Sequence, residues 1–341
     1  MKAAVLTGPH QLAVEEVPVP SPGPAEVLIR VEACGICGTD LRIQTADFPA
    51  NYPVIPGHEF CGTIEEIGPD AGELQVGRRV AVNPNTPCRR CRWCYRGEPH
   101  LCQSMTACGV TYNGGFAQYC KVAAELALPI PEGSGLPSDH WAMMEPISCC
   151  LHGIDVARIT AGDTVAILGG GSIGLLLMQI ARHAGAARLI LSEPNDRKRE
   201  LAKSLGADEV VNPLELGDGL VEALRDMTAG GADVVIEAAG LPVTAGQALK
   251  SARRGGTVLF FGVCPPNFEL PLNPYEVYHS ELTIRGTYTN PFTDSRALQL
   301  LASGRVQVGP IITHRFPLEQ VAEGLDAVRR GDTVKALVIP S

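Results

Sequence analysis

The sequence has 341 residues, more than one ordinary hydrophobic core organises, so its length predicts two domains. Hydrophobic residues make up 45% of the chain and charged residues 19%, a balance that indicates a globular protein and excludes a disordered one. The 28 basic and 37 acidic side chains give a formal net charge of −9. Because this acidic balance repels phosphate backbones, we exclude nucleic acid as a partner.

The start of the chain has no basic segment followed by an apolar run, so no signal peptide is expected. The longest apolar stretch, residues 165–181, contains three consecutive glycines and is shorter than the about 20 apolar residues that cross a membrane. Without a secretion signal, the twelve cysteines are expected to remain thiols or to bind metal. These features predict a cytoplasmic protein that does not contact membranes.

The first 150 residues are rich in glycine, proline and β-branched residues, and short strand-like runs recur between Pro, Gly and Asn. This pattern is typical of a compact, mostly antiparallel β domain. The expected strands cover residues 3–6, 27–31, 62–67, 79–82 and 116–122.

Two short segments of this β domain carry residues that can bind metal. The first, Gly35–Asp40, contains Cys37, and the second, Pro56–Glu59, contains His58 and Glu59. A cysteine, a histidine and a carboxylate can hold zinc and leave one position open for water or substrate. Because the two segments lie far apart in the sequence, spacing alone leaves open that Cys37 and His58 are ordinary core residues.

A four-cysteine cluster follows within residues 85–105. The cluster has the spacing C-x2-C-x2-C-x7-C and consists of Cys88, Cys91, Cys94 and Cys102. Four thiolates so spaced suit tetrahedral zinc with no open position, which is a structural site. The alternative is an iron–sulfur cluster, but ferredoxin motifs continue with x3-C-P, whereas here the last gap is seven residues and Gln103 follows. The spacing therefore favours zinc.

From about Asp155 the pattern changes to apolar strand-like runs that alternate with helix-length segments. The expected strands cover residues 165–168, 189–191, 209–211, 234–236, 258–261 and 282–285. Between the first two, apolar residues from Ile173 to Ala184 recur on one helical face, and Gly185 stands where a helix ends. Repeated strand–helix units predict a doubly wound parallel sheet. The last expected strand, residues 336–339, is predicted to return to the first domain.

A glycine-rich turn joins the first of these strands to its helix. It reads G-x-G-x-x-G at Gly169, Gly171 and Gly174, with Ser172 and Ile173 opening the helix. The first glycine permits the tight turn, the second admits a pyrophosphate close to the backbone, and the third packs the helix on the strand. The free N–H groups and positive partial charge of the helix N-terminus favour phosphates. The turn therefore predicts a dinucleotide site.

An acidic residue, Glu193, ends the second strand of this region. Its carboxylate is expected to accept a hydrogen bond from the adenosine ribose 2′-hydroxyl, which favours NAD, because a 2′-phosphate would meet like charge. Arg197, Lys198 and Arg199 follow closely, with Lys198 expected near the ribose. Since one of these cations could accommodate a phosphate, NADP is not excluded.

The order G-I-C-G-T-D, G-H-E, four cysteines and G-G-G-S-I-G resembles that of the zinc-containing medium-chain alcohol dehydrogenase family, and the resemblance covers the whole chain. It implies an α/β protein with a GroES-like, mostly antiparallel β catalytic domain and a doubly wound Rossmann domain. The catalytic domain is expected at residues 1–152 and 288–341, and the Rossmann domain at residues 153–287. The resemblance further implies alcohol dehydrogenase activity with catalytic zinc, structural zinc and NAD as cofactors.

The resemblance also assigns roles to individual residues. It implies that Cys37 and His58 are catalytic zinc ligands, and that Glu59 is a ligand or a carboxylate next to the ligands. Thr39 is expected to relay a proton, and Asp40 to hold the ligands in place.

Glu145-Pro146-Ile147-Ser148 resembles the E-P-L-S segment of the polyol dehydrogenase branch, in which the glutamate touches the zinc, its water or the substrate. Sorbitol dehydrogenases carry an Arg-Tyr pair where this chain has Thr289-Asn290, which argues against sorbitol but not against polyols as a class.

The alternatives to a polyol dehydrogenase are the L-threonine, diol and cyclitol dehydrogenases of the same family. A zinc-free quinone or enoyl reductase and a non-enzymatic nucleotide-binding protein are the rival interpretations. The family resemblance also predicts a homodimer or homotetramer.

Overall fold

The structure is a computed structural model that describes residues 1–340. The chain forms two compact units, and each consists of more than one segment. The first unit contains Met1–Ser148, Asn290–Gly304 and the segment from Val308 to the C-terminal strand. The second unit contains Cys149–Thr289 and Arg305–Gln307.

Seventeen strands are present in the described residues. Those of the first unit are β1 (Lys2–Leu6), β2 (Leu12–Glu16), β3 (Glu26–Gly35), β4 (Glu59–Ile67), β5 (Arg79–Val82), β6 (Asn85–Thr86), β7 (Thr106–Ala107), β8 (Tyr119–Ala123), β9 (Ala127–Pro129), β16 (Ile312–Pro317) and β17 (Lys335–Ile339). Those of the second unit are β10 (Thr164–Leu168), β11 (Arg188–Ser192), β12 (Glu209–Val211), β13 (Ala232–Glu237), β14 (Ala252–Phe260) and β15 (Thr283–Gly286).

The α-helices are mostly short. They are α1 (Gly38–Gln44), α2 (Arg92–Tyr95), α3 (Met144–Ala157), α4 (Ser172–Ala184), α5 (Asp196–Ser204), α6 (Pro213–Leu216), α7 (Leu220–Met227), α8 (Pro242–Ser251), α9 (Pro274–Ser280), α10 (Asp294–Ala302) and α11 (Val321–Arg330). The boundary between the two units falls inside α3, at Ser148 and Cys149. The helix continues across this boundary without interruption, so no turn signal in the sequence marks the boundary.

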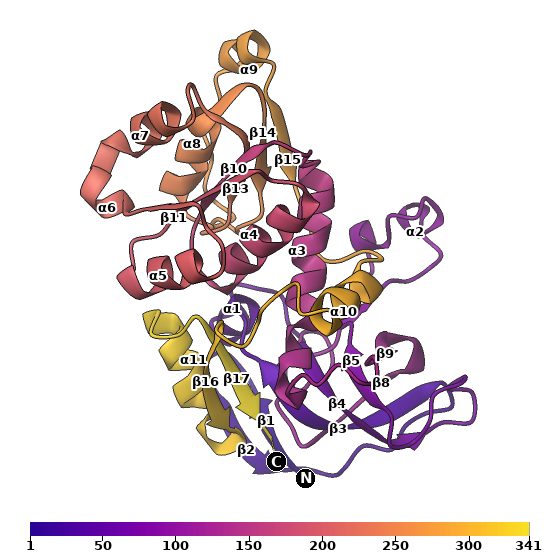
Figure 1. The fold of residues 1–341 in the computed structure, drawn as a ribbon. Helices are drawn as coiled ribbons and strands as arrows, with labels where there is room; N and C mark the ends of the chain where they lie inside the picture. The colour runs from indigo at the N-terminus through magenta and orange to yellow at the C-terminus, as the bar shows by residue number, and fades with distance from the viewer. Residues whose placement is uncertain (341) are drawn as a thin grey trace. The chain divides into compact units, whose positions relative to one another are not determined.

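The first unit is built on a seven-stranded sheet with the order β16-β17-β3-β4-β5-β9, in which β8 also pairs with β3. Strand β17 pairs antiparallel with β3, so the C-terminal segment completes a sheet whose other strands come mainly from the first 130 residues. Figure 1 shows these yellow C-terminal strands beside the indigo N-terminal part of the unit. Most pairings are antiparallel, as expected, but β16 and β17 are parallel.

The second unit has a six-stranded sheet with the order β12-β11-β10-β13-β14-β15, and every pairing in it is parallel. The chain starts in the middle at β10, winds outward to β12, and returns through β13 to the other edge at β15. This confirms the doubly wound parallel sheet. Helix α4 covers the predicted residues and ends at Gly185, whose φ of 118° is left-handed and suits glycine.

Two expectations from the sequence need correction. Strand β8 begins at Tyr119 and not at residue 116, because Phe116 and Gly115 form the bend that packs against the loop at Gly57. Five cysteines have no ligand-like grouping in the sequence, which predicts core positions for Cys34, Cys61, Cys108, Cys120 and Cys264. The first four are buried, whereas Cys264 is only half-buried. A thiol is small and weakly polar, so its residue type alone does not determine its burial.

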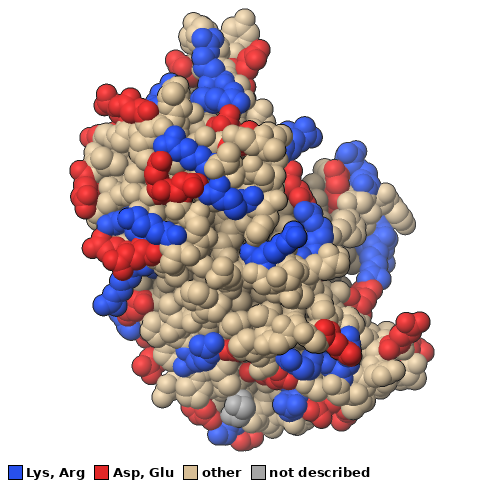
Figure 2. Space-filling model, in the orientation of Figure 1, with Lys and Arg blue, Asp and Glu red and all other residues tan. Residues whose placement is uncertain are grey.

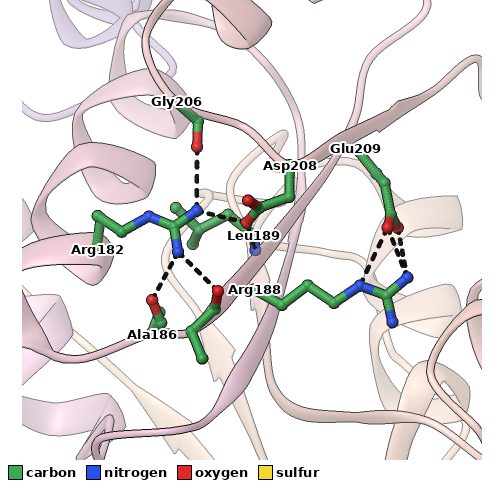
Figure 3. A network of polar contacts seen from close by, with 8 residues as sticks. Arg182, Ala186, Arg188, Leu189, Gly206, Asp208 and Glu209 are labelled. Atoms are coloured by element: carbon green, nitrogen blue, oxygen red, sulfur yellow. Dashed lines mark hydrogen bonds and ion pairs between the residues drawn. The ribbon is translucent and has the colours of Figure 1, made fainter.

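A network of arginines stabilises one edge of the second unit (Figure 3). The Arg182 guanidinium donates to the carbonyls of Ala186, Ala187 and Gly206 at 2.9, 2.8 and 3.2 Å and pairs with the Asp208 carboxylate. These carbonyls lie beyond the ends of α4 and α5, where helices leave acceptors unsatisfied. Nearby, Arg188 donates to both carboxylate oxygens of Glu209 and so links β11 to β12.

The distribution of charged side chains on the surface agrees with the mixed charge of the sequence. On the face drawn in Figure 2, basic and acidic side chains are interspersed over much of the surface. No helix among the described residues is long and apolar enough to cross a membrane.

Arg182→Ala is expected to lower the free energy of unfolding by about 1–3 kcal/mol, because it removes three hydrogen bonds to carbonyls and the ion pair with Asp208. Urea denaturation followed by circular dichroism measures this change. Arg197→Ala is the control, since its exposed side chain has no hydrogen bond or ion pair within the described chain. Equal losses in the two variants would contradict the assignment.

Candidate zinc and dinucleotide sites

Cys37 stands at the N-terminus of α1, where Asp40 holds the backbone. The Cys37 N–H donates to Asp40 Oδ2 at 2.8 Å, and Cys37 itself is the N-cap residue with an extended backbone. An N-cap residue has non-helical backbone angles, so its side chain does not have to point along a face of the helix. Asp40 is 2% exposed. This arrangement presents the Cys37 thiol from a fixed backbone.

The same Asp40 carboxylate reaches the second predicted segment. Its Oδ1 accepts from the Gly57 N–H at 3.3 Å and lies 3.5 Å from Nδ1 of His58. Gly57 has a φ of 92°, and a Cβ there would meet the Phe116 ring at 2.6 Å, so only glycine fits. The two segments, far apart in sequence, therefore share one buried carboxylate.

Glu59 begins β4 and lies opposite Gly35 at the end of β3. A Cβ on Gly35 would meet Glu59 Oε2 at 2.1 Å, so the glycine admits the carboxylate against the backbone of β3. Glu59 also forms an ion pair with Lys335 of β17, and both side chains are almost fully buried. Burial lowers the pKa of Lys335, but Glu59 and then Cys37 outweigh it and raise the pKa, so the lysine is cationic at neutral pH.

Donor atoms of Cys37, His58 and Glu59 all lie within 4.8 Å of one another, a geometry that could hold a metal ion. Burial lowers the pKa of His58, but Asp40 and Cys37 raise it well above its usual value, which indicates that the site stabilises positive charge. Thr39 lies beside this group, with 3.8 Å between its Oγ1 and Cys37 Sγ. Glu145 is buried in the first turn of α3 and is not part of the three-residue group.

The four cysteines form a second group, in which the sulfur atoms all lie within 4.8 Å of one another. Cys91 is the N-cap of the short helix α2, and its Sγ lies 3.6 Å from that of Cys94. The Cys94 backbone N–H is the main cause that lowers the pKa of Cys91 to about 6, which favours the thiolate that zinc binds. The β6–β7 pair closes the base of this loop. A four-sulfur group matches a structural zinc site.

The glycine-rich turn has the backbone geometry that its residues require. Gly169 has a φ of 113°, and a Cβ on Gly174 would meet the Gly169 carbonyl oxygen at 1.9 Å. In contrast, a Cβ on Gly171 would meet nothing within 4 Å, so this glycine leaves open space beside the N-terminus of α4. Ser172 and Ile173 follow in the first turn, whose N–H groups are available to a phosphate.

Glu193 lies beside this turn and is buried. Its Oε2 accepts from the Gly170 N–H at 2.8 Å, and its Oε1 accepts from the Asn195 N–H at 2.9 Å. The Arg199 guanidinium donates to the carbonyls of Glu193 and Pro194, both at 2.7 Å, and pairs with Asp196. Arg199 is therefore engaged by its own loop.

Lys198 lies in the first turn of α5, where its backbone N–H donates to the capping Asn195 side chain. Within the described residues, the Lys198 ammonium forms no hydrogen bond or ion pair with the glycine-rich turn, so its expected place near the ribose stays a prediction.

Lys335 is the residue that sequence reasoning missed. The available signal was a lysine inside the apolar strand run K-A-L-V-I, since a buried cation inside a strand requires an anionic partner. Nothing in the sequence indicated that the partner is Glu59, which lies 276 residues away.

Comparisons with known proteins identify both parts of the chain. A family model of the alcohol dehydrogenase GroES-like domain matches residues 23–132, and one of the zinc-binding dehydrogenases matches residues 172–303. D-arabinitol dehydrogenase 1 of Uromyces fabae is 33% identical and L-threonine 3-dehydrogenase of Pyrococcus horikoshii 37% identical. The alignments cover 100% and 94% of this chain and 97% and 93% of those proteins.

Solved structures agree. A protein of Sinorhizobium meliloti 1021, described as a zinc-binding dehydrogenase and bound to NADP, is 42% identical, with a TM-score of 0.96 and coverage of 99% of both chains. The sheets of the two units are thus those of a GroES-like domain and a Rossmann domain. The protein belongs to the zinc-containing alcohol dehydrogenase family, within its polyol dehydrogenase branch, and is an oxidoreductase.

Proposed function

We propose that this enzyme oxidises the secondary alcohol of a polyol or similar small alcohol to a ketone and transfers the hydride to NAD(P). The observation that carries the proposal is that donor atoms of Cys37, His58 and Glu59, from two separate segments of the chain, lie within 4.8 Å of one another. One thiolate, one imidazole and one carboxylate are donors that zinc accepts, and three protein ligands leave a fourth position for substrate.

The residues of this group would hold the catalytic zinc, and the four-cysteine loop would hold a structural one. When bound, the catalytic zinc supplies a Lewis acid that makes deprotonation of an alcohol accessible near neutral pH. Thr39, half-buried beside Cys37, would receive the proton and pass it toward solvent. Glu145 is proposed to contact the substrate or a water molecule, and not to complete the donor group.

Lys335 and Asp40 are proposed to set the charge and position of the ligands. Lys335 neutralises Glu59 when the carboxylate is not bound to metal, so that a buried anion does not stand alone. Asp40 faces Nδ1 of His58 at 3.5 Å, which would leave Nε2 as the metal-binding nitrogen.

NAD is the proposed preferred dinucleotide. The buried Glu193 carboxylate lies against the glycine-rich turn, where an adenosine ribose would lie, and Arg199 is engaged by carbonyls of its own loop. A 2′-phosphate would therefore lie next to the Glu193 carboxylate, whereas the Arg199 guanidinium is already hydrogen-bonded. The relative of Sinorhizobium meliloti bound to NADP makes NADP the alternative.

Polyols are the proposed substrate class, as for the D-arabinitol relative, and L-threonine, a diol or a cyclitol is the alternative. Asn290 replaces the tyrosine of the sorbitol-type Arg-Tyr pair, and the residue is 2% exposed. It bonds to Asn85 and Asp294, and so it is not available to bind a sugar alcohol.

A homodimer or homotetramer is proposed from the edge of the second sheet. Strand β15 ends the strand order, and exposed apolar side chains precede it: Leu272, Tyr275 and Tyr278. Exposed strand edges with apolar neighbours favour pairing with another chain. Sedimentation velocity measures the assembly directly. A cytoplasmic location is proposed because a reducing compartment preserves the cysteine thiols of the two candidate zinc sites.

Cys37→Ala is expected to abolish turnover and to leave dinucleotide binding intact, because it removes a ligand of the catalytic group alone. Native mass spectrometry should find about two zinc ions per chain in the wild type and one in the variant. Cys91→Ser should also lose one zinc ion and, unlike Cys37→Ala, should lower the Tm because the four-cysteine loop loses its cross-link. Normal turnover of Cys37→Ala with a panel of polyols would refute the assignment.

Gly171→Ala is expected to weaken dinucleotide binding, whereas Gly174→Ala is expected to lower the stability of the protein. The methyl group at residue 171 meets no atom in the protein, so the Tm should stay unchanged while the Kd of the dinucleotide rises about tenfold or more. The methyl group at residue 174 collides with the Gly169 carbonyl and should lower the Tm. Equal effects of the two substitutions on both quantities would contradict the proposed pyrophosphate position.

Glu193→Ala is expected to lower the preference for NAD over NADP, measured as the ratio of the two kcat/KM values, by about tenfold, which corresponds to about 1.4 kcal/mol. The physical reason is removal of the carboxylate that repels a 2′-phosphate. Glu200→Ala, an exposed substitution on the same helix as Lys198, is the control and should leave the ratio unchanged. A ratio that favours NADP in the wild type would overturn the proposed preference.

A further inference from the structure

A polar cluster of the first unit, made of buried and half-buried residues, links the start of α3 to the start of α10. The Ser148 hydroxyl donates to Asp294 Oδ1 at 2.9 Å and lies 2.8 Å from the Thr293 hydroxyl. The Thr293 hydroxyl in turn donates to the Ser148 carbonyl at 2.8 Å. Ser148 and Thr293 are 0% and 3% exposed, so the contacts between these two residues are shielded from water, whereas Asp294 is half-buried.

Three asparagines complete the cluster. Asn83 Nδ2 donates to Asp294 Oδ2 at 2.8 Å, and Asn290 Nδ2 donates to Asp294 Oδ1 at 3.0 Å. Asn85 Nδ2 donates to Asn290 Oδ1 at 2.7 Å. Asp294 therefore accepts hydrogen bonds from three segments of the chain, which lie between 4 and 211 residues away from it.

The orientations of the Asn83 and Asn290 amides are each fixed by a second contact. Asn83 Oδ1 accepts from the Asn85 backbone N–H at 3.0 Å, so this side chain cannot rotate by half a turn without loss of a bond. Asn290 is held in the same way because its Oδ1 accepts from Asn85. Only a group that accepts at both of its oxygens fits between the donors, and that group is the Asp294 carboxylate.

The segments that meet at Asp294 are those that carry proposed functional groups. Ser148 lies in the first helical turns of α3, three residues after Glu145. Asn83 and Asn85 lie at the base of the four-cysteine loop, where β6 begins. A partly satisfied buried network costs stability, whereas a fully satisfied one rigidifies the segments that it joins.

We propose that Asp294 is a positioning residue that fixes the first turn of α3, and with it Glu145, against the base of the four-cysteine loop. The inference rests on the proposed function for the role of Glu145, but the mechanical link rests on the contacts alone. Asp294 acts through the Ser148 hydroxyl, and Asn83 and Asn290 hold the carboxylate in place.

The exchange of a carboxylate and an amide tests this link. In Asp294→Asn, an amide NH2 must face the donor Nδ2 of either Asn83 or Asn290. In Asn83→Asp, two carboxylates face each other. The double variant Asn83→Asp, Asp294→Asn restores one donor and one acceptor across the same contact, and the amide oxygen introduced at position 294 can still accept from Ser148 and Asn290.

The first readout is kinetic. Each single variant is expected to lower kcat by about tenfold to a hundredfold, as small misplacements of an active-site group do, with a smaller change in KM. The double variant should recover most of kcat, so the effects of the two substitutions on kcat are not additive. The loss in Asn83→Asp should diminish at lower pH, where one of the two facing carboxylates binds a proton. Glu32→Gln, which removes a half-buried carboxylate bonded to the Thr63 hydroxyl in the same unit, is the control and should leave kcat unchanged.

The second readout is independent of activity. Hydrogen–deuterium exchange of peptides that cover residues 144–150 should accelerate in Asp294→Asn and return to the wild-type rate in the double variant. Unchanged exchange and unchanged kcat in Asp294→Asn would overturn the inference, as would equal loss of kcat in the double and single variants. If the wild type oxidises no alcohol but exchange responds as expected, the link stands and the proposed function fails.

Discussion

The catalytic unit depends on one buried carboxylate. Asp40 accepts hydrogen bonds from the backbone N–H groups of Cys37 and Gly57 and faces the His58 ring. These contacts join a helix N-terminus to a loop that is 17 residues away. Because a buried carboxylate is stable only when it is well supplied with donors, both segments must stay where Asp40 can reach them.

The charges around this carboxylate explain why the site is suited to a cation. The buried Glu59 and Asp40 and the half-buried Cys37 supply negative or ionisable groups, and the buried Lys335 is the cation that offsets them in the protein itself. Zinc would compete with Lys335 for Glu59. The strand that contributes Lys335 comes from the C-terminus, so the return of the chain to the first unit completes the electrostatics of the site as well as its sheet.

The two units use glycine in the same physical way for different purposes. In the catalytic unit, Gly35 and Gly57 create space for the Glu59 carboxylate and the Phe116 ring. In the dinucleotide unit, Gly169 and Gly174 form the tight turn and Gly171 leaves open space for a ligand. A substitution at the first four positions meets protein atoms, whereas one at Gly171 meets only the proposed ligand. This difference separates residues needed for folding from residues needed for binding.

The local features of this protein can be predicted from its amino-acid sequence. The helix after the glycine-rich turn, the parallel strands and the four-cysteine spacing follow from periodicity and from contacts between residues near in the chain. Folding of the whole chain is what brings Glu59 to Lys335, Asp40 to Gly57, and Ser148 and Asn83 to Asp294. These pairs lie 17 to 276 residues apart, and the type of a polar residue does not indicate which distant residue it contacts. The partner is set by sheet pairing and burial, which depend on all of the segments together.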